Sequence, residues 1–277
     1  MLVVDDLSRL RYARSRLEGT FGLVPTMGAL HGGHLSLVRK ARAECDHVGV
    51  SIFVNPAQFG PHEDFARYPR DLKRDLQLLE TLGVDLVWTP DPQIVYDRDF
   101  QTWITVECVT APLEGKVRPG HFRGVATIVA KLFNVFTPTR AYFGQKDAQQ
   151  VAVIRRMAAD LDFPIEISIC PTVREPDGLA MSSRNVHLEG GERSAATVLF
   201  RALSAAKSLY LEGERDAEHL RLAMRRVLDE ESLAQVDYVS AADPETMREL
   251  AQVGDRVLLS LAAKIGKTRL IDNFLLP

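Results

Sequence analysis

Two histidines in a glycine-rich turn are the residues of this sequence best suited to phosphate chemistry. His31 and His34 stand three positions apart, with Gly32 and Gly33 between them, and a helical apolar pattern begins at Leu35. Residues three apart share one face of a helix. The first turn of a helix also offers N–H groups and a partial positive charge that suit phosphate. The turn therefore predicts a polyphosphate site, although a surface helix start with two solvated histidines fits the same spacing.

A second group of candidate residues carries amide side chains. Asn55 and Gln58 follow the apolar, β-rich run at 48–54. Amides at the end of a strand could hold a carboxylate or a hydroxyl group, so both are candidates for substrate binding. A plain Asn-Pro turn is the simpler interpretation of these residues taken alone.

Two cationic residues stand in the remaining candidate clusters. Lys146 follows an apolar run and precedes a helical pattern, a position that suits an anionic ligand. Its neighbour Asp147 fits a helix N-cap. Arg184 ends the run that starts at Met181, which also offers two hydroxyls and backbone donors. This run suits a clamp on phosphate, and an exposed interdomain loop is the alternative.

The elements that would position these clusters alternate between strand and helix along residues 1–172. Strands are predicted at 21–24, 48–54, 85–88, 102–108, 140–143 and 165–169, and helices at 5–18, 35–45, 69–82, 125–136 and 148–160. This alternation predicts a doubly wound, parallel α/β sheet of the Rossmann-like kind. Right-handed crossovers would put the turns at 25–34 and 144–147 at the carboxyl edge of its strands.

The character of the chain changes after residue 172. Residues 190–230 predict two helices, and short strands are predicted at 236–240, 256–261 and 267–271. We therefore expect a catalytic domain at 1–172 and a smaller C-terminal α+β domain at 173–277. The smaller domain would carry the loop at 181–185 and act as a lid. The long Gly- and Arg-rich loop at 115–124 is expected to be functional or mobile, with no assigned role.

Composition restricts the class of protein. The chain has 277 residues, 46% of them hydrophobic and 26% charged, with a formal net charge of -3. This length and composition predict two domains with full cores. The acidic balance argues against non-specific nucleic-acid binding. No apolar stretch predicts a transmembrane helix or a signal peptide. Three widely spaced cysteines predict free thiols in a reducing cytoplasm rather than a zinc site or disulfides.

The whole chain resembles the pantoate–β-alanine ligase family, most densely from about residue 20 to 190. The motifs that carry the resemblance are PTMGALHGGH at 25–34, FVNPAQFG at 53–60, EDFARYP at 63–69, RPGHFRG at 118–124, GQKDAQQ at 144–150 and DGLAMSSRN at 177–185. Two small departures are Gln145, where the family often has glutamate, and Gly32 in a variable position. The order and spacing of the motifs are more specific than any one of them.

The resemblance implies an activity and its partners. The family belongs to the nucleotidyltransferase superfamily with a His-x-Gly-His element, which class I aminoacyl-tRNA synthetases share. It condenses D-pantoate with β-alanine, using ATP and Mg²⁺, through a pantoyl adenylate, and releases pyrophosphate and AMP. A homodimer in the cytoplasm is expected, with neither nucleic acid nor membrane as a partner. The residues that would contact the metal stay unknown.

The resemblance also implies roles for individual residues. The catalytic residues would be His34, Lys146 and Arg184. Pantoate would be bound by Gln58 and Gln150, and β-alanine by Gln58 and Asn55. The residues expected to contact ATP are Met27, Gly28, Ala29, Leu30, His31, Gly32, Gly33, His34, Gly144, Gln145, Lys146, Asp147, Val173, Met181, Ser182, Ser183 and Arg184.

Two other classes of protein share part of these features. A nucleotidyltransferase that keeps the nucleotide in its product, such as a cytidylyltransferase, shares the His-x-Gly-His element. This alternative does not explain the presence of Asn55, Gln58 and Gln150. A non-catalytic nucleotide- or RNA-binding module is disfavoured by the acidic balance and by the intact polar clusters. Free AMP as a product would distinguish the ligase from the transferase.

Overall fold

The computed structural model describes residues 1–61 and 63–277, which form two compact units. The first unit consists of Met1–Glu107, Arg118–Gly144 and Val153–Pro171. The second consists of Cys108–Val117, Gln145–Ala152 and Thr172–Pro277. The segments 108–117 and 145–152 thus belong to the same unit as the C-terminal residues. A functional division of the chain between residues 172 and 173 stays a prediction.

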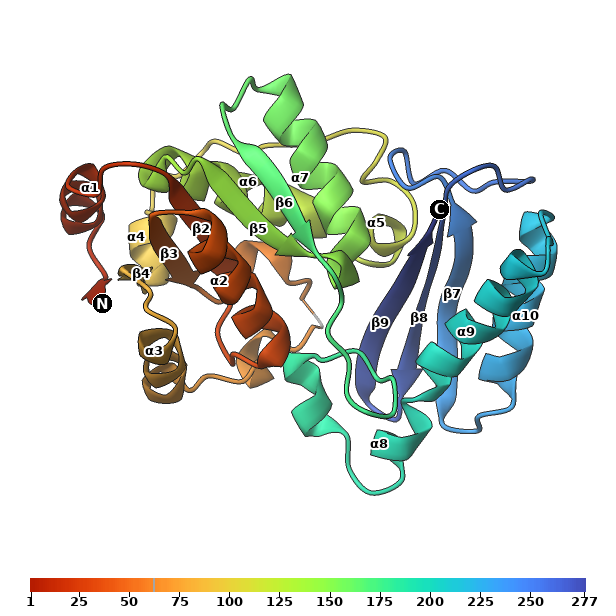
Figure 1. Cartoon of the computed structure of the whole chain (residues 1–277). Helices are drawn as coiled ribbons and strands as arrows, with labels where there is room; N and C mark the ends of the chain where they lie inside the picture. The colour runs from red at the N-terminus through yellow and green to blue at the C-terminus, as the bar shows by residue number, and fades with distance from the viewer. Residues whose placement is uncertain (62) are drawn as a thin grey trace. The chain divides into compact units, whose positions relative to one another are not determined.

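Six parallel strands form the sheet of the first unit, in the order β1-β4-β3-β2-β5-β6 (Figure 1). Their bounds are β1 (Leu2–Val4), β2 (Phe21–Thr26), β3 (His47–Ile52), β4 (Leu86–Trp88), β5 (Arg140–Gly144) and β6 (Glu166–Cys170). The apolar runs of β2 and β3 are almost completely buried, as the central strands of a sheet covered on both faces must be. The predicted doubly wound sheet is confirmed.

Helices cover both faces of this sheet. Val24 of β2 packs in one cluster with Val38, whereas Phe21 and Trp88 contact the ring of Phe136 on the opposite face. The helical elements of the first unit are α1 (Leu7–Ser15), α2 (Gly32–Glu44), η1 (Pro56–Gln58), η2 (Phe65–Arg67), α3 (Leu72–Thr81), α4 (Pro92–Val95) and α6 (His121–Phe136). The helix α7 (Ala148–Asp160) begins in the second unit and ends in the first.

Several predicted elements differ from the structure, and two of the differences involve α6. Residues 102–108, predicted as a strand, form none. The N–H of Ile104 donates instead to the side chain of Thr127 on α6, with a distance to Oγ1 of 3.0 Å. The helix predicted at 125–136 begins four residues earlier, at His121. Gly124 is typical of a loop, but in the structure it lies within α6 and packs against the backbone of Ala57. A Cβ at this position would lie 2.3 Å from the carbonyl oxygen of Ala57.

The second unit has a three-stranded antiparallel sheet, in the order β7-β8-β9. One face of this sheet is covered by α9 and α10, whose apolar side chains form a common core with it (Figure 1). The elements are α5 (Glu114–Val117), η3 (Gln145–Asp147), η4 (Ser183–His187), α8 (Glu192–Ala195), α9 (Val198–Leu211), α10 (Ala217–Asp229), β7 (Ala234–Ala242), β8 (Val257–Ile265) and β9 (Thr268–Leu276). The expected smaller α+β fold is therefore present. Among the described residues, no helix is long and apolar enough to cross a membrane.

Candidate active site

A buried carboxylate holds the glycine-rich turn between β2 and α2. Gly28 and Ala29 both adopt positive φ angles, 83° and 50°, and this conformation is uncommon for a residue with a side chain. Asp75 of α3 is only 1% exposed and accepts the N–H groups of Ala29 and Leu30, both at 2.8 Å. Burial raises the pKa of Asp75, and these two hydrogen bonds oppose the rise. The carboxylate thus fixes the backbone that immediately precedes His31.

The two histidines cap the start of α2 together. The Nδ1 atom of His31 accepts the N–H of Gly33 (3.1 Å), and Nδ1 of His34 accepts the N–H of His31 (3.4 Å). The ring centroids lie 4.1 Å apart. Because both Nδ1 atoms accept, each neutral ring carries its proton on Nε2. The predicted pairing of the two imidazoles at a helix start is confirmed.

The amide of Asn55 is buried and fully engaged within the protein. Its Nδ2 donates to Gln58 Oε1 (3.0 Å) and to the carbonyl oxygen of Gly124 (3.2 Å). Its Oδ1 accepts the N–H of Ala57 (3.2 Å) and the hydroxyl of Tyr96 (2.9 Å). Burial raises the pKa of Tyr96, and the bond to Asn55 opposes that rise, so the phenol stays a donor. Asn55 therefore orients the side chain of Gln58 through the hydrogen bond to Oε1.

Gln58 joins the amide cluster to the histidine turn. Its Oε1 accepts from Asn55, and its Nε2 donates to the sulfur of Met27 at 3.1 Å. A thioether is a weak acceptor, so a substrate oxygen could replace it at little cost. The first unit thus brings together two predicted site segments that lie about thirty residues apart in the sequence, the interval separating Met27 from Gln58.

Three residues to which the sequence assigns no role form a hydrogen-bonded chain that ends on the backbone carbonyl of Gln58. Arg118 forms a bidentate pair with Glu63, with both N···O distances 2.7 Å, and also contacts Nε2 of His121 (3.1 Å). Nδ1 of His121 donates to the carbonyl oxygen of Gln58 at 2.8 Å. Burial raises the pKa of Glu63, but the hydrogen bonds and charge of Arg118 outweigh this and lower it. The sequence predicts that the loop at 115–124 is functional or mobile, but it does not show these contacts with Glu63 and Gln58.

The turn that carries Lys146 is fixed by β9. Asn273, 4% exposed, donates through Nδ2 to the carbonyl oxygens of Gln145 (3.0 Å) and Lys146 (2.8 Å). Its Oδ1 accepts from Gln145 Nε2 at 3.1 Å. Gln145 to Asp147 form the short helix η3, which continues as α7. Gly144 ends β5 in the first unit, next to β2, so the chain leaves the sheet here at the predicted edge.

The loop at 173–184 is a short hairpin followed by a capped turn. Val173 accepts the N–H of Met181 (3.0 Å), and Arg174 pairs with Ala180. Ser182 caps η4, where its Oγ accepts the N–H of Arg184 (3.3 Å). Residues 181–185 are half-buried. The predicted phosphate loop is therefore an ordered turn with hydroxyl, backbone and guanidinium groups within four residues.

Neighbouring glutamines at the start of α7 have different environments. Gln149 is 6% exposed and bonds the backbone of Val109, Pro112 and Glu114, so it is structural. Gln150, the predicted pantoate ligand, is half-buried. The second unit thus contains Gln150 together with the 145–147 turn and the 173–184 loop, whereas the His31, Asn55 and Gln58 clusters belong to the first.

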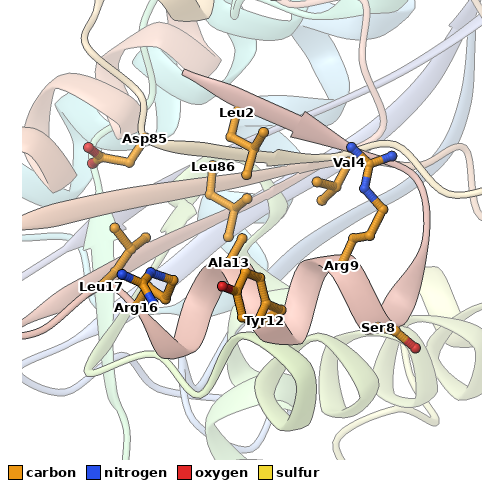
Figure 2. A pocket seen from close by; sticks show the side chains of 10 residues that line it. All are labelled: Leu2, Val4, Ser8, Arg9, Tyr12, Ala13, Arg16, Leu17, Asp85 and Leu86. Atoms are coloured by element: carbon orange, nitrogen blue, oxygen red, sulfur yellow. The ribbon is translucent and has the colours of Figure 1, made fainter.

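A pocket of about 540 Å³ lies between α1 and the strands β1 and β4 (Figure 2). Leu2 and Leu86 from the strands, with Tyr12 and Ala13 from α1, give it a largely apolar lining. Among the described residues that line it, none belongs to the predicted site. The pocket is therefore not lined by the residues that are predicted to bind ATP.

Among residues 1–61 and 63–277, no three His, Cys, Asp or Glu side chains are grouped so that they could hold a metal ion. The acidic residues of the site are also occupied. Asp75 accepts two backbone N–H groups, and Glu63 is paired with Arg118. A magnesium ion here would depend mainly on phosphate oxygens and water, which is usual for this ion.

Comparisons with known proteins agree along the full length of the chain. A pantothenate synthetase of Roseiflexus sp. (strain RS-1) is 62% identical over 276 residues, covering 100% of this chain and 99% of that protein. The crystal structure of pantothenate synthetase from Thermus thermophilus matches with a TM-score of 0.95 at 47% identity, covering 99% of each chain.

A third relative was crystallised with ligands. Pantoate-β-alanine ligase from Francisella tularensis, complexed with β-γ ATP and β-alanine, matches with a TM-score of 0.82 and 36% identity. This match covers 99% of our chain and 97% of that one. The family model for pantoate-β-alanine ligase matches residues 3–275. Because the family model and these relatives match nearly the whole chain, the chain belongs to the pantoate–β-alanine ligase family.

Proposed function

We propose that this ligase works through a pantoyl adenylate, in two steps. As a pantoate–β-alanine ligase, it forms pantothenate in an ATP-dependent reaction. In the first step, a carboxylate oxygen of pantoate attacks the α-phosphorus of ATP, and pyrophosphate leaves. In the second step, the amine of β-alanine attacks the acyl carbon, loses a proton and displaces AMP.

The contact between Gln58 and Met27 is the observation that carries this proposal. It places an oriented amide donor next to the histidine turn in one unit. An amide that binds the pantoate carboxylate or hydroxyls there would hold the nucleophile close to the phosphates, which is the geometry that adenylation needs. The 3.1 Å contact with sulfur would be exchanged for a stronger bond to substrate oxygen.

Donors to the phosphates are the second requirement, because two anions must meet. We assign this role to His34 through its Nε2–H, to Lys146 and to Arg184, with Ser182 and Ser183 binding the leaving pyrophosphate. The other proposed ATP contacts are the turn at 27–33, Gly144, Gln145, Asp147, Val173 and Met181. These assignments are supported by the family motifs that contain the residues.

Gln58 and Gln150 are proposed to bind pantoate, with Gln58 also facing the incoming β-alanine. Asn55 would serve β-alanine mainly by holding Gln58, because the hydrogen-bonding capacity of its own amide is used within the protein. The relative from Francisella tularensis, complexed with β-γ ATP and β-alanine, supports a site for both molecules.

Four further properties are proposed from the family. Mg²⁺ would enter as the ATP complex and reduce the charge on the phosphates. Residues 173–277 would close as a lid that keeps water from the adenylate. The protein would work in the cytoplasm as a homodimer. Light scattering on the purified chain should then give twice its 30.9 kDa, and a mass of one chain would contradict the dimer.

Isotope transfer tests the proposed intermediate directly. Pantoate labelled with ¹⁸O in its carboxylate should deliver one ¹⁸O atom to the phosphate of the released AMP, because that oxygen bridges carbon and phosphorus in the adenylate. Mass spectrometry of AMP gives the answer. Unlabelled AMP, or a stable nucleotidylated product, would contradict the mechanism and favour a different transferase reaction.

A further inference from the structure

Two adjacent residues of β9 contact both segments of the second unit that are assigned to phosphate. Asp272 is 3% exposed and Asn273 is 4% exposed. Side chains of successive strand residues point to opposite faces of a sheet. One face of β9 therefore meets the turn at 145–147, and the other meets the hairpin at 173–181.

Asn273 fixes the turn with all of its amide atoms. Both Nδ2 hydrogens are used, one on the carbonyl of Gln145 and one on that of Lys146, and Oδ1 accepts from the Gln145 side chain. Two consecutive peptide planes are thereby oriented by one buried side chain. An aspartate of the same shape could not do this, because a carboxylate has no hydrogen to donate.

Asp272 fixes the hairpin through Arg174. The guanidinium forms a bidentate pair with the carboxylate (2.6 and 2.9 Å), and Nη1 also donates to the carbonyl oxygen of Gly178 (3.0 Å). Gly178 needs its positive φ of 92° and its missing side chain, because a Cβ would lie 2.2 Å from the ring of Phe200. The same carboxylate accepts the N–H of Asn273 at 2.8 Å, which joins the two anchors.

We propose that Asp272 and Asn273 are positioning residues for adenylation. They set the turn that presents Lys146 and the loop that presents residues 182–184 in one fixed arrangement. Preorganised donors act on charge that develops in the transition state, and a misplacement of about 1 Å can cost on the order of 10²-fold in rate. This inference rests on the proposed roles of Lys146 and the 182–184 loop.

The test is Asn273→Asp, assayed by pantoate-dependent ATP–pyrophosphate exchange. We expect the rate at saturating substrates to fall about 10- to 100-fold, while the KM values for ATP and pantoate stay within about threefold. Asn134→Asp, an exposed position on α6, is the matched control and should keep the rate. If Asn273→Asp is unfolded, Asn273→Ser, which retains one donor and adds no charge, replaces it and should show a smaller loss.

A double-mutant cycle with Lys146→Ala separates positioning from general damage. If Asn273 acts through Lys146, Asn273→Asp should cause less than about a twofold further loss in the Lys146→Ala background. Losses that multiply in the double variant, or a folded Asn273 variant with exchange within twofold of the parent, would overturn the inference. Normal exchange in Lys146→Ala alone would instead refute the proposed function of that lysine.

Discussion

At the scale of single residues, the proposed site depends on side chains whose directions are set by their neighbours. His34 accepts a backbone N–H through Nδ1, which puts the proton of its neutral ring on Nε2, the atom proposed to donate to phosphate. Gln58 is held through Oε1 by Asn55, which turns its donor toward Met27. In both cases one atom is used for orientation, and the other carries the proposed chemistry.

Replacing His34 with alanine should lower pantoate-dependent exchange about 10²–10³-fold, the usual effect of removing one donor to a transition-state oxyanion. The substitution also removes the acceptor of the 3.4 Å hydrogen bond from the His31 N–H. Folding should therefore be checked by thermal unfolding. His219→Ala, an exposed position on α10, serves as the control. Near-normal exchange in a folded His34→Ala would eliminate the proposed role.

Replacing Gln58 with alanine should act mainly on pantoate. A hydrogen bond to a charged group contributes about 1.5–3 kcal/mol, so the KM for pantoate should rise about tenfold or more. Steady-state kinetics with each substrate varied in turn gives the comparison. A change confined to the KM for ATP would show that Gln58 contacts ATP rather than pantoate, and would contradict the proposed role.

At the scale of elements, the segments with proposed catalytic roles are turns that other elements hold by buried polar contacts. Asp75 of α3 holds the turn before α2, and Arg118 with His121, at the start of α6, holds the backbone of η1. Such contacts join residues far apart in sequence. Ala29 and Asp75 are 46 positions apart, so neither motif alone shows the pairing.

Asp75→Asn tests the first of these anchors. Asparagine keeps one acceptor oxygen but turns an N–H₂ group toward a backbone N–H, which should destabilise folding by about 1–3 kcal/mol. Exchange should fall as well, because the turn leads directly into His31. Chemical denaturation and exchange should be compared with Asp99→Asn, an exposed position. Unchanged stability and rate would show that the carboxylate is dispensable.

The pair of Glu63 and Arg118 predicts a pH dependence of stability. The pKa of Glu63 is lowered below its usual 4.5 in the folded protein. The unfolded chain therefore binds the proton more readily, and the pair stabilises the fold fully above pH 4.5. This contribution is lost as pH falls through the lowered folded value.

Glu63→Gln should reveal this contribution. The variant should be less stable than the parent by about 1–3 kcal/mol at neutral pH, which is the usual cost of removing one partner of a buried hydrogen bond. The difference should shrink as the pH falls below 4.5. Urea unfolding at a series of pH values measures it. A difference that does not change with pH would rule out the ion pair as its source.

At the scale of the whole molecule, periodicity predicted the sheet and the α+β unit because local patterns report burial directly. The runs of β2 and β3 and the apolar face of α6 are of this kind. The support for the site could not be predicted. Asn273 forms hydrogen bonds with Lys146 and Gln145, which lie 127 and 128 positions earlier in the chain. The sequence predicts a loop at Gly124, whereas its missing Cβ makes room for the backbone of η1.

The measurement that tests the central claim most directly is ATP–pyrophosphate exchange with pantoate present and β-alanine absent. An adenylate mechanism predicts that labelled pyrophosphate enters ATP only when pantoate is added, since the first step reverses without the amine. AMP should then accumulate when β-alanine is supplied. Exchange that needs β-alanine, or exchange that proceeds without pantoate, would contradict the account.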